Sequence, residues 1–92
     1  SEEAIRRRLW LRRLRLLQRH VRAGRLLDIS TGEGHFLSVG AGAGFEVDGT
    51  EFSREGARLC EERGFQVLVT DVESLPSGLP PYDVITLWHV LE

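Results

Sequence analysis

The chain has 92 residues, of which 41% are hydrophobic and 28% are charged, and its formal net charge is −2. A chain this short buries only about 60–65% of its unfolded surface, so one folding unit over residues 1–92 is expected and two domains are excluded. No apolar run reaches the roughly 20 residues of a membrane-spanning helix and no signal-peptide core follows the charged start, so we expect a cytoplasmic protein without membrane contact. Cys60 is the lone cysteine and can form neither an internal disulfide nor a multi-cysteine zinc site, so no metal is expected.

The small net charge conceals a basic start and an acidic remainder. Residues 1–25 carry nine Arg and two Glu, whereas residues 26–92 carry three Arg and twelve carboxylates. An amphipathic basic helix is predicted within residues 1–24, running from about residue 3 to residue 22 and ended by Gly24. Its apolar residues recur at helical spacing and are Trp10, Leu14, Leu17 and Val21, widened by Ile5, Leu9 and Leu16. We interpret its arginines as a solvated face rather than a contact with nucleic acid.

Short apolar segments alternate with helical patterns after this helix. Strands are predicted over residues 25–29, 45–50, 66–70 and 82–88, and helices over 35–42 and, after Ser53 as N-cap, up to residue 63. Asp48 and Thr50 are unusual in a strand that helices cover, and they suggest reduced stability. Strands that alternate with helices indicate an α/β fold with a parallel sheet, helices on both faces and a ligand at the carboxyl ends of the strands.

Three acidic residues end or follow the first three predicted strands. They are Asp28, Glu51 and Asp71, and in a parallel sheet all three lie on one rim. Between the first two lies a loop in which Gly32 and Gly34 permit tight turns and let a ligand approach the backbone beside a helix N-terminus. A carboxylate after the second strand is a typical partner for two ribose hydroxyls. The pattern therefore predicts a nucleoside ligand.

The same loop argues against a nucleotide that carries phosphates. Leu37 stands where the dinucleotide fingerprint requires its third glycine, and the sequence contains no phosphate-cradling Gly-Lys-Ser/Thr. Asp28 and Glu33 would repel a pyrophosphate but would tolerate a cationic ligand.

Four segments, taken together, resemble the class I S-adenosylmethionine-dependent methyltransferases. They are LLDISTGEGHFL, FEVDGTEFSREGARLCEERGF, VTDVESLP and YDVITLWHVLE, which resemble the first glycine motif, the second strand with its helix, the third-strand acidic site and the fourth strand. The resemblance implies S-adenosylmethionine as cofactor and S-adenosylhomocysteine as product. It also implies a Rossmann-like sheet with the strand order 3-2-1-4, incomplete relative to a full seven-stranded methyltransferase.

The resemblance also assigns roles to individual residues. The methionine end of the cofactor is implied to face Asp28, Gly32 and Gly34, with Ser30 at the position of the family's first glycine. The ribose is implied to bind Glu51. The residues implied around the adenine are Phe52, Asp71 and Val72, and Trp88 and His89 are implied to line the pocket near the reactive methyl.

Several points stay open on the sequence alone. His89 is a candidate general base or merely shapes the loop, and His35 is expected to cap a helix or line the cofactor site rather than act as a base. The methyl acceptor is unidentified. A homodimer through the open, apolar edge of the fourth strand is an expectation, as is a chain that binds cofactor without turnover. The alternatives are a fragment of an NAD-dependent dehydrogenase and a non-catalytic module that binds a partner through its basic first helix.

Overall fold

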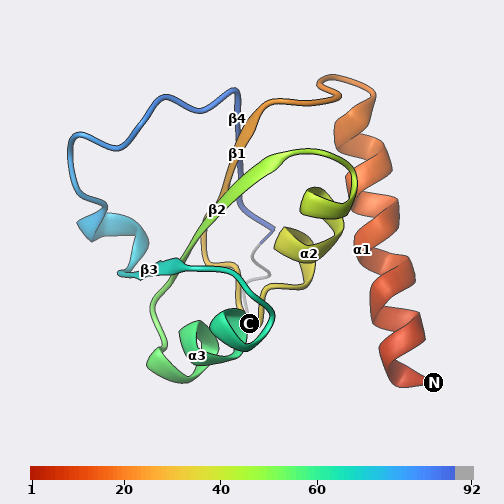
Figure 1. Cartoon of the computed structure of the whole chain (residues 1–92), viewed down its shortest axis with the longest axis horizontal. Coiled ribbons are helices and arrows are strands. Elements are labelled where there is room, and N and C mark those ends of the chain that lie inside the picture. The colour runs from red at the N-terminus through yellow and green to blue at the C-terminus, as the bar shows by residue number, and fades with distance from the viewer. Residues whose placement is uncertain (89–92) are drawn as a thin grey trace.

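The computed structural model describes residues 1–88 of the chain. Its helices are α1 (Glu2–Gln18), α2 (His35–Gly42) and α3 (Arg54–Glu62), and a short 3-10 helix, η1, spans Val72–Ser74. Its strands are β1 (Arg25–Asp28), β2 (Glu46–Glu51), β3 (Val67–Val69) and β4 (Val84–Thr86). The strands form one parallel sheet with the order β3-β2-β1-β4, which confirms the predicted fold class (Figure 1).

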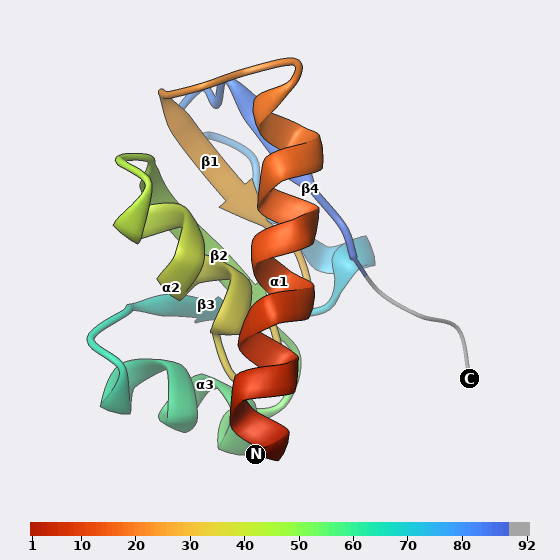
Figure 2. The same cartoon turned by 90° about the vertical axis from the view of Figure 1, so that its right-hand side faces the viewer.

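Figure 2 shows how the elements are layered around this sheet. Within residues 1–88 the three α-helices lie on one side of the sheet, in front of it in this view, with α1 packed against α2. The connection between β3 and β4, which contains η1, lies over the other side, where Leu79 and Tyr82 face Leu27 and Leu68 across a cavity of about 340 Å³. Within residues 1–88 the second face thus carries only this connection with its 3-10 helix, and not the α-helix that a sheet covered by helices on both faces was predicted to have there.

The main core forms between the helix layer and β1. Leu26 and Phe36 are almost fully buried and pack with Leu14, Val39 and Phe45. The apolar stripe predicted for α1 is confirmed, because Trp10, Leu17 and Val21 all pack against this cluster. Hydrophobic burial of this kind, about 25 cal/mol per Å² of apolar surface, fixes α1 onto the sheet although its other face is charged.

The ends and the width of α1 differ from the prediction. The helix ends at Gln18 with Arg19 as C-cap, four residues earlier than expected, and Gly24 takes its left-handed backbone conformation in the following turn. The predicted widening of the stripe was wrong, since its three members are exposed by 43–66% and Leu11 packs on the core instead. The three exposed residues are Ile5, Leu9 and Leu16.

Three of the four predicted strands were too long, most clearly the last, while β2 is shifted by one residue to 46–51. Tyr82 and Asp83 precede β4 and contact other strands: the Tyr82 hydroxyl donates to Asp48 Oδ2 at 2.8 Å, and Asp83 Oδ2 accepts from the Arg25 amide at 2.8 Å. The first contact also gives Asp48, the odd residue of β2, a hydrogen-bonded partner. Among the described residues no helix is long and apolar enough to cross a membrane.

Candidate functional site

The loop between β1 and α2 makes three left-handed turns in five residues. Its φ angles are +58° at Ser30, +62° at Gly32 and +89° at Gly34. The two glycines adopt this conformation without strain, as their spacing predicted, whereas Ser30 is the one non-glycine residue among 1–88 that adopts it. The Ser30 amide is held by Thr50 Oγ1 at 3.2 Å, which explains a polar residue in the covered strand β2.

Glu51 lies under this loop and fixes it. The side chain is only 4% exposed, and its Oε1 accepts from the Gly32 amide at 2.9 Å while Oε2 accepts from the Ser53 amide at 3.0 Å. A side chain at Gly56 would lie 2.9 Å from this carboxylate, so glycine there leaves room for it. Each oxygen keeps a further lone pair, so the carboxylate can still accept from a ligand hydroxyl.

Cys60 of α3 supports the loop from the other side. Its side chain is fully buried, its thiol donates to the Gly32 carbonyl at 3.1 Å, and a side chain at Gly34 would lie 3.1 Å from its sulfur. Burial raises the pKa of the Cys60 thiol to about 11, and the nearby Glu51 carboxylate adds to this. The thiol therefore stays protonated at neutral pH and acts as a packing residue and hydrogen-bond donor.

Asp28 ends β1 in a buried position at the same rim. It is 2% exposed, and its Oδ1 accepts from Thr86 Oγ1 of β4 at 2.7 Å. Burial raises the pKa of Asp28 to about 6, an effect that the Thr86 hydrogen bond only partly offsets. A buried carboxylate of this kind gains stability when a cation takes the place of the lost water.

A cavity of about 420 Å³ opens in front of Asp28, between the loop and α1. Three buried polar atoms around it have no hydrogen-bond partner within residues 1–88: Thr31 Oγ1, His35 Nε2 and Trp88 Nε1. Buried polar groups are normally satisfied, so three at one cavity indicate a polar ligand. The lining residues are Arg6, Trp10, Arg13, Asp28, Ser30, Thr31, Gly32, Glu33, His35 and Trp88.

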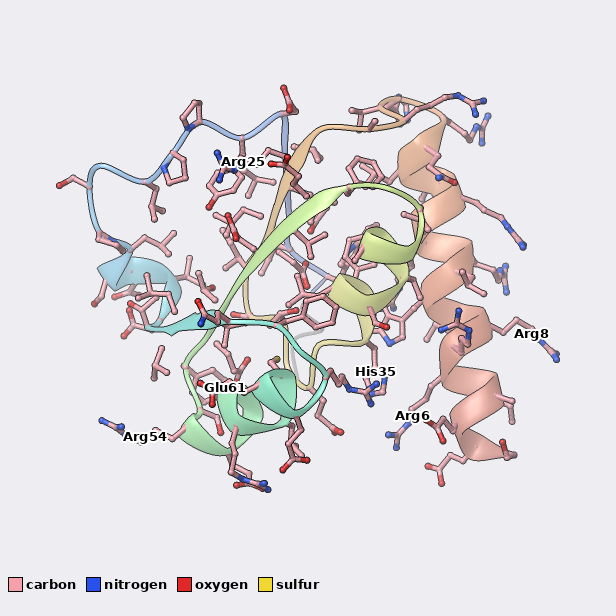
Figure 3. The ribbon with its side chains drawn as sticks, in the orientation of Figure 1. Arg6, Arg8, Arg25, His35, Arg54 and Glu61 are labelled. Atoms are coloured by element: carbon pink, nitrogen blue, oxygen red, sulfur yellow. The ribbon has the colours of Figure 1, made fainter. Side chains whose placement is uncertain are left out.

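His35 faces this cavity from the first turn of α2. Burial lowers its pKa from the ordinary value, and the neighbouring Arg63 lowers it further, so the imidazole is neutral at pH 7. Figure 3 shows Arg6 extending from α1 toward the side on which His35 lies, whereas Arg8 points away from the sheet. His35 thus lines this cavity, and its predicted place beside a cofactor stays a prediction.

A second cavity of about 260 Å³ lies on the other side of Ser30. It is lined by Ser30, Phe52, Asp71, Val72 and Leu87. Phe52 is 68% exposed and Val72 is 47% exposed, so this part of the rim is open. Asp71 caps η1, and its Oδ1 accepts from the Ser74 amide at 2.8 Å.

The predicted site residues therefore fall into three groups. Asp28, Gly32 and Trp88 line the larger cavity, Phe52, Asp71 and Val72 line the smaller one, and Ser30 lines both. Gly34 and Glu51 line neither cavity but shape the loop between them. The prediction for His89 lies outside the described residues.

The sequence interpretation missed the wall that α1 contributes. Arg6, Trp10 and Arg13 line the larger cavity, although the arginines of this helix were predicted to be solvated. Their spacing of i, i+4 and i+7 gave the signal that they share the face of the apolar stripe. Among residues 1–88 no cluster of His, Cys, Asp and Glu is suited to hold a metal ion.

Comparison with known proteins identifies the family. A family model described as a methyltransferase domain matches residues 2–92. The chain belongs to this family. The matched range includes both glycine turns, the three acidic residues of the rim and all four strands, so the resemblance predicted from the motifs is confirmed.

One curated protein and two solved structures illustrate how similar the chain is to its relatives. An uncharacterized protein of Methanocaldococcus jannaschii is 34% identical over 77 residues, which cover 83% of this chain and 35% of that protein. A solved protein of Pyrococcus horikoshii is 26% identical with a TM-score of 0.76, over 92% of this chain and 42% of that one. A Thermotoga maritima protein described as a SAM-dependent methyltransferase, "possible histamine N-methyltransferase", is 25% identical with a TM-score of 0.69, over 86% and 36%. The chain thus spans about a third of the length of the curated relative that it matches.

Proposed function

We propose that this chain is the S-adenosylmethionine-binding part of a methyltransferase. The observation that carries the proposal is the carboxyl edge of the sheet, where Asp28 and Glu51 end two strands and Asp71 follows the third, around a loop with two left-handed glycines. Membership in the methyltransferase-domain family and the similarity to a SAM-dependent methyltransferase support it.

The residues present fit this cofactor in charge and in polarity. Its methionine end carries an ammonium group, a carboxylate and a sulfonium, and the larger cavity offers the buried Asp28 carboxylate together with the unpaired Thr31, His35 and Trp88 atoms. The smaller cavity offers Phe52 and Val72 as apolar surfaces for a base and Asp71 as an acceptor for an amino group. Ser30 lies where the two cavities meet, and Glu51 lies beneath the loop there, where a ribose would connect the two ends.

The role of these site residues in methyl transfer is to position the methyl donor. When bound, S-adenosylmethionine supplies an electrophilic methyl group on its sulfonium. The chain's own residues hold the donor in one orientation, since the loop is fixed by Glu51, Cys60 and Thr50 before any ligand arrives. Such preorganisation accounts for much of the rate in transfers between two bound groups. The methyl acceptor is left open, and turnover is not expected of the 92 residues alone.

The NAD-dependent alternative is disfavoured by the start of α2. Leu37, which stands at the position of the missing third glycine, is fully buried, and it faces Gly49 of β2, where a side chain would lie 3.0 Å from its methyl group. The third glycine of the dinucleotide fingerprint, which serves close packing of helix and strand, is therefore absent from α2, and the room for close packing comes from Gly49 of β2 instead. The acids Asp28 and Glu33 beside the loop would also repel a pyrophosphate.

Calorimetric titration of the chain with S-adenosylmethionine, S-adenosylhomocysteine and NAD tests the proposal. We expect the first two to bind and NAD to bind at least tenfold more weakly. Preferential binding of NAD would favour the dehydrogenase alternative. Binding of neither class, combined with salt-sensitive binding to an anionic polymer that is lost when the α1 arginines are replaced, would favour the non-catalytic module instead.

A further inference from the structure

Helix α1 adds a cation to a site that the sequence assigns to the strand ends alone. Arg6 and Arg13 both line the larger cavity, but their partners differ. Arg6 pairs with Glu2 of its own helix at 3.1 Å, and its side chain is 51% exposed. Arg13 is half-buried and forms no ion pair with any carboxylate of residues 1–88. An arginine that is partly desolvated without an acidic partner indicates that an anion binds there.

Two tryptophans hold the Arg13 guanidinium in place. Its carbon lies 4.6 Å from the centre of the Trp10 ring and 5.6 Å from the centre of the Trp88 ring. Both rings are anchored in turn, because each packs against the buried Phe36, at 5.8 Å and 5.3 Å between centroids. Contacts of this kind orient a guanidinium but accept few of its five N–H groups, which remain available to a carboxylate.

The opposite wall of the cavity also favours a negative group. Helix α2 begins at this wall, and its N-cap, Gly34, offers no side chain to the free amides of the first turn. Free amides at a helix N-terminus attract an anion, whereas Asp28 at the strand end attracts a cation. Thr31 belongs to the Asp28 side, because its hydroxyl lies near that carboxylate and lowers its pKa. The cavity therefore has a negative and a positive end, as a zwitterionic amino acid group requires.

We propose that Arg13 binds the α-carboxylate of the methionyl part of the cofactor, so that α1 completes the cofactor site. This assignment rests on the proposed function and adds to it the group that the larger cavity recognises. It also gives a role to the Trp10–Arg13–Trp88 stack, which joins α1 to the residues that follow β4.

The test compares two probes that differ only in the carboxylate. S-adenosylhomocysteine and its decarboxylated analogue are titrated against the wild-type chain and against Arg13→Gln and Arg13→Lys. We expect Arg13→Gln to weaken S-adenosylhomocysteine binding about 10- to 100-fold, the range for a charged hydrogen bond, and to leave the decarboxylated analogue unchanged. Arg13→Lys keeps the positive charge but loses the paired N–H groups of the guanidinium. This variant should therefore prefer S-adenosylhomocysteine over the decarboxylated analogue more than Arg13→Gln does, but less than the wild type does.

Arg12→Gln is the matched control, because Arg12 is the exposed neighbour on the same helix and its loss changes the net charge equally. It should leave both affinities within about twofold. Unchanged binding of the analogue to Arg13→Gln also shows that the variant is folded. An equal loss for both probes, or a full preference for the carboxylate in Arg13→Gln, overturns the assignment of Arg13. Failure of the wild-type chain to bind either probe contradicts the proposed function instead.

Discussion

The two halves of the candidate site are built in opposite ways. In the buried half, formed by Asp28 and by Glu51 beneath the glycine loop, the two carboxylates are 2% and 4% exposed, and each accepts a hydrogen bond from outside its own strand. In the half that follows β3, Phe52 is 68% exposed and Val72 is 47% exposed, and Asp71 bonds only to its own 3-10 helix. The first half is therefore formed before a ligand arrives, and the second half gains most of its burial from the ligand.

This difference separates stability from recognition. Changes in the buried half should alter the free energy of unfolding together with ligand affinity, because the same carboxylates hold the loop and face the ligand. Changes in the exposed half should alter affinity alone. Four substitutions, taken from the largest expected effect on stability to the smallest, test whether the boundary between the two halves lies at Ser30.

Asp28→Asn should raise the stability of the chain at neutral pH. The pKa of Asp28 rises from 3.8 to about 6 on folding, so the folded state binds the proton more tightly and this carboxyl favours folding most below pH 4. Stability should fall as the pH rises from about 4 to about 6 and stay lower above it, by about 3 kcal/mol. The amide removes this slope and keeps an acceptor for Thr86.

Urea unfolding of wild type and Asp28→Asn at pH 4, 5, 6 and 8 checks this expectation. Glu61→Gln, an exposed change on α3, is the control and should leave the slope as it is. The asparagine variant should also bind S-adenosylhomocysteine more weakly. A variant less stable than wild type at pH 8 would mean that the Thr86 hydrogen bond outweighs the cost of burying the charge.

Glu51→Ala should weaken both stability and affinity. It leaves the amides of Gly32 and Ser53 without their acceptor, and it removes the predicted partner of the ribose hydroxyls. We expect a loss of about 1–3 kcal/mol in the free energy of unfolding and of about 1.5–3 kcal/mol in S-adenosylhomocysteine binding. Glu46→Ala at the exposed start of the same strand is the control. Unchanged affinity in a destabilised Glu51→Ala would remove Glu51 from the ligand and leave it a loop anchor.

The sequence predicted the residues at the carboxyl ends of the strands better than it predicted the residues of α1 that line the larger cavity. The strand order, the two glycine turns and the buried Asp28 follow from local patterns and from family motifs that cover the chain. The α1 wall could not be predicted in the same way, because it depends on Trp10 and Trp88 meeting across 78 positions of sequence at Phe36. The roles of Asp48 and Thr50 could not be predicted either, because their hydrogen-bond donors are distant in sequence. Tyr82 donates to Asp48 and the Ser30 amide donates to Thr50, so neither polar residue lies in the strand without a partner.

Ser30→Gly should stabilise the chain. Ser30 has φ +58°, where a side chain costs about 1–2 kcal/mol, and its one described hydrogen bond, from the amide to Thr50, does not need the side chain. Glycine also gains entropy in the unfolded chain, so the net increase should be about 0.5–1 kcal/mol. Thermal unfolding measures it, with the exposed Ser77→Gly, which has no positive φ, as a control that should not stabilise. Equal effects at both sites would show that the strain at Ser30 is negligible.

Asp71→Asn should change recognition of the base without changing stability. Asparagine caps a helical turn as well as aspartate does, so the bond to the Ser74 amide and the 3-10 helix should persist. The free carboxylate oxygen is the predicted acceptor for the amino group of adenine, and its replacement should cost about 0.5–1.5 kcal/mol of affinity for adenosine. Inosine, which carries an oxygen in place of that amino group, should then be discriminated against less strongly than by the wild type.

Titrations with both nucleosides measure this, and Glu73→Gln on the same exposed turn serves as the control. If Asp71→Asn kept both the affinity and the discrimination, the adenine would have to bind elsewhere and the exposed half would lose its assigned ligand.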